Sequence, residues 1–195
     1  MVLTIAAVAT GALISAGLGA WAYTRFGVER PSYRILVAEG AFEIRDYPAL
    51  TVAEVTRSGE RNKALRAGFR PLAGYIFAKE RDGQSIAMTA PVTQMPVGSE
   101  QWVVRFIMPR TYDLDDLPVP ASDVRLAELP PMRMAAVRFD GAWTDANIAV
   151  KERALRDWLA SGGHMPDGPA TYAYYNDPFT PGFLRRNEVL IPLRR

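Results

Sequence analysis

The alternation of apolar and polar side chains is clearest in residues 41–57, AFEIRDYPALTVAEVTR. A period of two is typical of a strand with one buried face. Pro48 interrupts the run, and proline cannot donate a backbone hydrogen bond inside a sheet. The pattern therefore predicts two successive strands, one on each side of Pro48.

A helical period follows these strands. Apolar residues recur at intervals of three and four, which places them on one face of a helix: Leu65, Phe69, Leu72 and Ile76. Ser58 and Glu60 precede them and are typical of a helix start. Pro71 falls inside the pattern, and we expect it to kink the helix or to end its first half.

Short strand-like runs separated by turn residues make up much of the remaining chain. After the helix, IAMTAPVTQMPV at 86–97 and QWVVRFIMP at 101–109 predict two strands, and residues 111–123 predict a loop. Further strands are predicted at 124–129, 132–141, 170–176 and 187–193.

A second helix is predicted between these later strands. Thr144 and Asp145 are typical of its start, and it runs to about Ala160, with apolar residues on one face: Ile148, Leu155 and Leu159. Gly162 and Gly163 should end it, because glycine adopts the backbone conformation that terminates helices.

The order strand–helix–strand–strand thus occurs twice, in residues 49–109 and 132–193, and each unit spans about sixty residues. We predict an α+β fold in which duplicated βαββ units form one sheet or a distorted β-barrel with two flanking helices. A groove between a helix and the sheet is the natural place for a ligand.

The N-terminal segment has a different pattern. Residues 1–24 carry no charged side chain, and the run Val2–Thr24 is apolar or small throughout. Its 23 residues would reach about 34 Å as a helix, enough to cross a hydrocarbon core of about 30 Å. We therefore predict an N-terminal transmembrane helix, with an anchor and linker at 1–29 and a domain at 30–195. The alternative is a signal peptide cleaved at the small-x-small site Ala20-Trp21-Ala22.

Basic residues follow the apolar run on its C-terminal side, at Arg25, Arg30 and Arg34. The positive-inside rule then slightly favours a single-pass protein with a cytoplasmic domain. If the segment is a signal peptide instead, the domain is exported.

Composition excludes several kinds of site. The chain has no Cys and one His, which excludes disulfides, Fe–S clusters, thiolate zinc sites and every metal site that needs two histidines. The 23 basic residues are spread from Arg25 to Arg195 without a long cluster and are balanced by 21 acidic ones. We therefore expect no binding of nucleic acid.

Motifs for catalysis are also missing. The sequence contains no phosphate-binding glycine loop, Gly-x-Ser-x-Gly elbow or dinucleotide fingerprint. Asp115-Asp116 lies in a Pro-rich loop typical of solvated carboxylates. We predict that the protein is not an enzyme. His164 is the only imidazole available to a metal, but a lone His in a Gly/Pro loop is typical of an exposed side chain.

Four stretches carry more information than composition does. They are FEIRDYP in the opening segment Tyr33–Tyr47, Ile86–Val92 (IAMTAPV), Tyr175–Phe179 (YNDPF) and Arg185–Val189 (RRNEV). In this order and spacing they resemble the SOUL/haem-binding protein family, and the resemblance covers roughly residues 33–195.

The resemblance implies a duplicated βαββ distorted barrel, similar to gyrase-inhibitor-like effector-binding domains. It also implies that haem or another tetrapyrrole binds in an apolar groove beside the first helix, without a strong axial ligand. Arg66 is then placed near a haem propionate, whereas a second basic residue of some members falls on Gly74. The implied groove residues are Leu65, Arg66, Phe69, Leu72, Ala73 and Ile76, with Phe179 on the covering loop. The apolar helix positions fit a role in the core equally well.

The function that follows is a non-catalytic haem buffer or carrier, whose partners are a porphyrin and, through residues 2–24, a membrane. Two alternatives remain open. One is an effector-binding or hydrolase-like module for small hydrophobic molecules, which would need a buried carboxylate such as Glu54 or Glu188 in the groove. The other is a protein-interaction module without a small ligand.

Overall fold

The computed structural model describes residues 28–79, 82–120, 123–176 and 180–194. Its elements in chain order are β1 (Arg34–Glu39), β2 (Phe42–Tyr47), β3 (Leu50–Ser58), α2 (Arg61–Ile76), β4 (Val92–Gly98), β5 (Gln101–Ile107), η1 (Leu114–Asp116), β6 (Arg125–Leu129), β7 (Met132–Asp140), α3 (Asp145–Ser161), β8 (Thr171–Tyr174), η2 (Gly182–Leu184) and β9 (Arg186–Pro192). The predicted membrane segment, residues 2–24, lies outside these ranges. Neither of the described α-helices has the length and apolarity that a membrane crossing requires.

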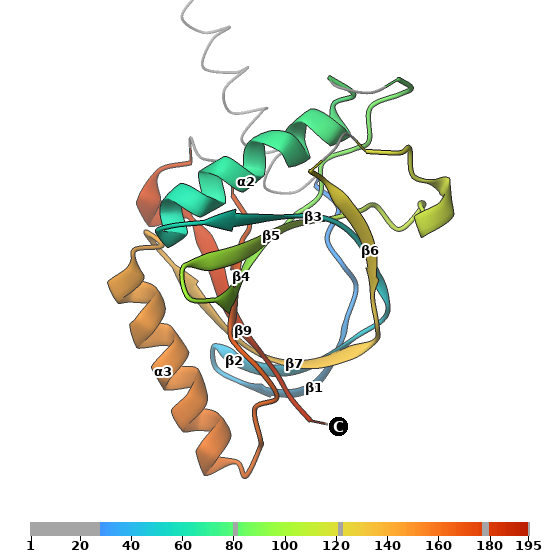
Figure 1. Ribbon diagram of the computed structural model, residues 1–195. Helices are drawn as coiled ribbons and strands as arrows, with labels where there is room; N and C mark the ends of the chain where they lie inside the picture. Colours follow the sequence, from blue (N-terminus) through green and yellow to red (C-terminus); the bar gives the residue numbers. More distant parts are fainter. Residues whose placement is uncertain (1–27, 80–81, 121–122, 177–179, 195) are drawn as a thin grey trace, which may run out of the picture.

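The nine strands form one antiparallel sheet in the order β1-β2-β7-β9-β8-β4-β5-β3-β6. The sheet curls strongly, and both helices lie outside the curl (Figure 1). Within the described ranges no ladder joins β1 to β6, which are the two edges. The predicted barrel is therefore a curled half-barrel, and the α+β class with two flanking helices is confirmed.

The internal duplication is visible in the strand order. The unit β3-α2-β4-β5 contributes three adjacent strands, and so does β7-α3-β8-β9; the two triplets meet where β4 pairs with β8. The strands before each unit are exchanged: β2 pairs with β7 of the second unit, and β6 pairs with β3 of the first. This exchange joins the halves along their outer strands as well as at the centre.

Helix α2 corrects one expectation. It runs without a break through Pro71 to Ile76, so of the two effects expected of Pro71, a kink or an end of the helix, the second does not occur. Pro71 has no N–H to donate to the carbonyl of Ala67 one turn earlier. The Nε of Arg57 on β3 donates to that oxygen instead, at 3.3 Å. The apolar residues beyond the proline also remain packed on the sheet, which keeps the helix in place.

The strands of the structure also differ from the predicted ones at two places. Residues 86–91 do not belong to β4, because their backbone groups bond elsewhere: the Ile86 N–H donates to the carbonyl of Ile76 (2.7 Å), and the Ala90 N–H to that of Glu29 (2.9 Å). Strand β1 was not predicted, because all six of its residues are exposed and no apolar alternation marks it.

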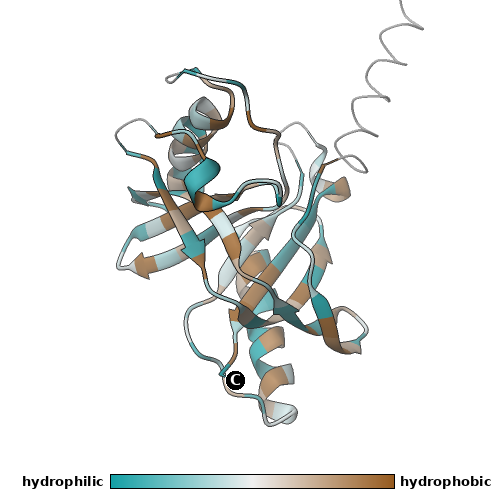
Figure 2. Cartoon of the chain, turned by 90° about the vertical axis from the view of Figure 1, so that its right-hand side faces the viewer, coloured by the Kyte–Doolittle hydropathy of each residue, from teal (hydrophilic) through white to brown (hydrophobic). Residues whose placement is uncertain are grey.

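Hydrophobic and hydrophilic residues alternate along the strands, as the bands of colour in Figure 2 show, because successive strand residues point to opposite faces of a sheet. On the outer face, α2 packs on β3 and β5, and α3 packs on β7 and β9. Gly68 permits the close approach of α2, since a Cβ there would lie 2.7 Å from a Val104 methyl group. On the opposite face of β7, Met134 and Ala136 join a third apolar cluster.

Candidate ligand-binding site

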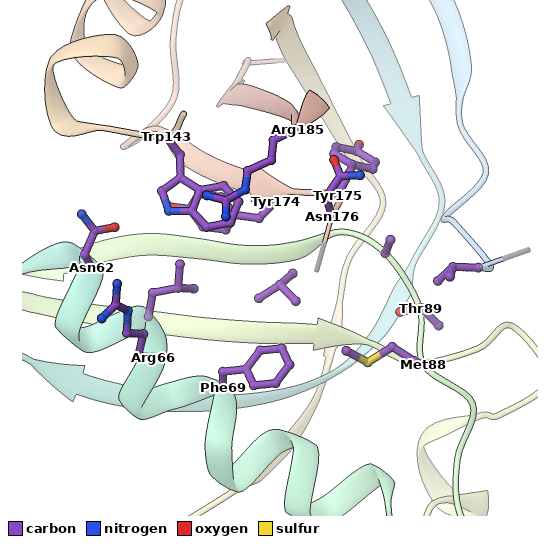
Figure 3. Close-up of a pocket in the computed structure, with 14 residues that line it drawn as sticks. Asn62, Arg66, Phe69, Met88, Thr89, Trp143, Tyr174, Tyr175, Asn176 and Arg185 are labelled. Carbon is purple, nitrogen blue, oxygen red and sulfur yellow. The ribbon is translucent and has the colours of Figure 1, made fainter. Parts of the chain in front are cut away.

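A cavity of about 460 Å³ lies where the two duplicated halves meet. We call it the α2 cavity, because four residues of that helix line it. Figure 3 labels Asn62, Arg66 and Phe69 among them. Its volume falls in the range of small-molecule sites, about 300–1,000 Å³. Its lining residues come from six segments: Val28; Asn62, Leu65, Arg66 and Phe69; Met88, Thr89, Ala90 and Val92; Trp143; Tyr174, Tyr175 and Asn176; and Arg185.

The N-terminal half of α2 faces the α2 cavity. Asn62, Leu65, Arg66 and Phe69 are separated by three, one and three residues, which places them on one helix face. Of the residues expected to meet a ligand, the structure therefore brings together Leu65, Arg66 and Phe69.

The C-terminal half of α2 faces the hydrophobic core and not the α2 cavity. Leu72 and Ile76 are fully buried in the core between the helix and the sheet, and Ala73 packs against the same cluster. None of these three is part of the described cavity lining. Phe179, expected on a covering loop, lies outside the described residues.

Aromatic rings form much of the cavity wall. Phe69 packs edge-on against Phe106, with ring centres 5.1 Å apart, and Trp143 packs edge-on against Tyr174 at the same distance. The buried Arg61 holds the second pair in place: it donates to the Tyr174 hydroxyl (2.8 Å) and to the Trp143 carbonyl (2.6 Å). Burial raises the pKa of Tyr174 to about 12. Its hydroxyl donates to Gln94 (3.0 Å).

Two guanidinium groups lie toward the Trp143 end of the α2 cavity. The Arg185 guanidinium stacks on the Trp143 ring at 4.1 Å, and its Nε donates to the Thr180 carbonyl (2.8 Å). Arg66 is exposed and makes no ion pair or hydrogen bond with any residue that the structure describes. In Figure 3 both point toward this end from opposite walls, and Met88 lies farther along the wall that Phe69 forms. The two guanidinium groups make this end of the cavity basic, which suits an anionic group.

Sequence reasoning missed most of the other contributors to this site, among them Arg61, Trp143 and Arg185. Arg185 entered only through the RRNEV motif of the family resemblance, and Arg61 and Trp143 were not singled out at all. Each lies at an element boundary, where apolar periodicity carries little information. The Arg185-Arg186 pair in the RRNEV motif was the one available signal, because consecutive residues entering a strand point to opposite faces.

The two buried carboxylates lie outside the described cavity lining. Glu188 accepts two hydrogen bonds from Arg45 (2.7 and 3.2 Å) and one from Arg186 (2.7 Å). Glu54 accepts hydrogen bonds from Arg105 (2.6 Å) and Arg125 (2.9 Å). Burial alone would raise the pKa of each carboxyl, but the arginines outweigh it and hold both pKa values below their usual range. The carboxylate that a hydrolase-like site would need is therefore absent from the described lining.

His164 lies far from the α2 cavity. His164 follows the C-terminal end of α3, whereas the cavity residue Trp143 precedes its N-terminal end. The 17 residues of α3 between these two ends span about 25 Å. The exposed His164 ring lies 6.4 Å from that of Trp158 and lines a separate cavity of about 140 Å³. The described ranges contain no cluster of three or more His, Cys, Asp or Glu that could hold a metal.

The curled sheet of duplicated units with two flanking helices defines a class of fold that several solved structures share. The C-terminal domain of EcmrR is similar with a TM-score of 0.61 and 11% identity, covering 84% of this chain and 98% of that one. A hydrolase from Listeria innocua is similar with a TM-score of 0.58 and 12% identity, covering 82% and 94%. At these identities the similarity shows the fold alone.

The sequence defines the particular family. The model of the family described as SOUL heme-binding protein matches residues 28–192, and the chain belongs to this family. It is 27% identical to Heme-binding protein 2 of Mus musculus over 164 residues, 78% of this chain and 80% of the relative. It is 29% identical to Heme-binding protein 2 of Homo sapiens over 147 residues, 71% and 72% of the two chains. The family assignment made from the motifs is confirmed.

Proposed function

We propose that this protein binds haem or another tetrapyrrole in the α2 cavity and acts as a non-catalytic buffer or carrier. The observation that carries the proposal is the combination of an apolar cavity with aromatic walls and two guanidinium groups toward one end. A tetrapyrrole has the matching chemistry, since it is a flat apolar ring with carboxylates on one edge. Membership of the SOUL heme-binding family supports the same ligand.

The expected affinity follows from apolar burial. A ring that buries about 400 Å² would contribute roughly 10 kcal/mol at ~25 cal/mol per Å². The loss of freedom on association and the ordering of side chains subtract several kcal/mol from this value. We therefore expect dissociation constants in the micromolar range or weaker, which suit a protein that takes up and releases its ligand.

The first prediction tests this binding mode. The full chain in lipid nanodiscs, titrated with haem and followed by its Soret absorbance, should saturate, and iron-free protoporphyrin should bind within about tenfold as tightly. Arg66→Ala should weaken haem binding two- to fivefold, because a partly exposed ion pair is worth about 0.5–1 kcal/mol. Arg185→Ala should weaken it further, since it also removes the stack on Trp143.

Two controls accompany this titration. Arg70→Ala removes another exposed arginine of α2 that is outside the described lining, and it should leave the affinity unchanged. His164→Ala should also have little effect. Empty nanodiscs correct for haem dissolved in lipid. If neither porphyrin saturates the protein above this blank, the proposed function is wrong.

We further propose that residues 2–24 anchor the protein in a membrane, with the domain on the cytoplasmic side. The 23 uncharged residues and the arginines that follow them support this proposal. The second prediction is that the full chain stays in the membrane fraction after high-salt and alkaline washes, because apolar insertion is insensitive to salt. A mature protein that begins at Tyr23 would show a cleaved signal peptide instead.

A further inference from the structure

The thioether sulfur of Met88 lies in the α2 cavity and could coordinate iron. The binding mode proposed above gives it no such role. Met88 lies in the segment before β4, is half-buried, and packs against the core cluster that includes Phe106. Figure 3 shows its side chain directed into the cavity toward Phe69. In the same view, Phe69 and Met88 lie on one wall, and Trp143 and Tyr174 lie on the other. A flat ring held between these walls would have one face toward the sulfur.

The competing iron donors of the described lining are two tyrosine hydroxyls, and both are already engaged. Tyr174 receives a hydrogen bond from Arg61 and donates to Gln94, and Tyr175 donates to the buried Glu188 (2.8 Å). Iron binds tyrosine as the phenolate, but burial raises the pKa of both phenols far above neutral pH. The chain has no Cys, and its single His lies beyond the far end of α3.

We propose that Met88 is an axial ligand of the haem iron in the α2 cavity, an inference that rests on the haem-binding function proposed above. A thioether is a neutral, soft and weak donor that raises the reduction potential of haem iron. Methionine also has three flexible torsions, which allow the sulfur to adjust to the position of the ring. The protein should therefore hold ferrous haem more tightly than a purely apolar cavity would.

Iron-edge X-ray absorption of the full chain loaded with ferrous haem in nanodiscs tests this ligand directly. The spectrum of the unmodified protein should show a sulfur neighbour of iron, and Met88→Leu should lose it. Met95→Leu is the matched control, because Met95 is a partly buried methionine of β4 outside the described lining. The reduction potential should fall in Met88→Leu by about 59 mV if the preference for ferrous haem drops tenfold.

Two further measurements separate this inference from the function on which it rests. Iron-free protoporphyrin should bind equally well to the unmodified protein and to Met88→Leu, since no iron bond is lost. Met88→His should replace the sulfur neighbour with nitrogen and increase the affinity for haem relative to protoporphyrin. Haem binding without a sulfur neighbour in the unmodified protein would overturn the role of Met88 alone. Failure of both porphyrins to bind would overturn the proposed function itself.

Discussion

Replacing Glu188 with glutamine is expected to lower the free energy of unfolding by about 3 kcal/mol. The Glu188 side chain is 0% exposed and that of Arg45 is 2% exposed. Removing one partner of a buried ion pair typically costs about 3–5 kcal/mol, because the remaining charge stays buried without compensation. Glu43 also contacts Arg45, at 2.6 Å, but its side chain is partly exposed. Because Glu43 still pairs with Arg45 after the substitution, we expect a loss at the lower end of this range.

Urea unfolding of the full chain in detergent measures this loss. Glu128→Gln is the matched control, since Glu128 is an exposed strand residue of β6, and its substitution should change stability by less than about 0.5 kcal/mol. Equal losses for the two variants would show that the buried pair contributes nothing net. The double replacement of Arg45 and Glu188 by apolar residues of similar size should recover part of the loss.

The same pair predicts a pH dependence. The arginines hold the pKa of Glu188 in the folded protein below its ordinary value of 4.5. A carboxyl with a lowered folded pKa stabilises the fold above its unfolded pKa, and this contribution disappears as the pH falls through the folded pKa. The stability difference between the unmodified protein and Glu188→Gln should thus be full at neutral pH and should decrease below about pH 4.5.

Replacing Phe69 with alanine is expected to weaken haem binding by about 10- to 30-fold. Phe69 is half-buried, lines the α2 cavity and packs edge-on against Phe106. Loss of an aromatic wall removes apolar contact and ring packing worth about 1.5–2 kcal/mol together. Iron-free protoporphyrin should lose the same factor, because the contact is with the ring and not with the metal.

Phe77→Ala is the control for this prediction. Phe77 is an exposed phenylalanine at the C-terminal end of α2 and is outside the described lining. The affinity of this variant should equal that of the unmodified protein, and circular dichroism should show that both variants keep the fold. If the two substitutions weaken binding equally, the ligand does not occupy the α2 cavity.

Local patterns were sufficient to predict most elements of the fold. The alternation on either side of Pro48 corresponds to β2 and β3, and the periodic run after Glu60 corresponds to α2. Thr144 caps α3 as expected, because its hydroxyl accepts a hydrogen bond from the Asn147 N–H (3.2 Å). The duplication followed as well, since it is an order of elements along the chain.

Contacts between distant segments decided what the patterns could not. Strand β1 has no buried face, so no alternation marks it, and its pairing with β2 alone defines it as a strand. The exchange of β2 and β6 between the halves depends on pairing across about 70 to 95 residues, which no local pattern records. The open edges of the curled sheet follow from the same pairings.

For the binding site, too, the sequence predicted one part and the tertiary structure decided the rest. Helical spacing placed four residues on one face of the helix: Leu65, Phe69, Leu72 and Ile76. Spacing does not show which other part of the protein that face contacts. At the C-terminal half of α2 this face fills the core. At the N-terminal half it lines a cavity that Trp143 and Arg185 of the second half complete. The sequence alone determined the family, most of the elements and the exclusion of cysteine and paired-histidine chemistry, because these depend on residue types and their order. Only the tertiary structure decided which side chains meet around the cavity, because the packing of elements far apart in the chain brings them together.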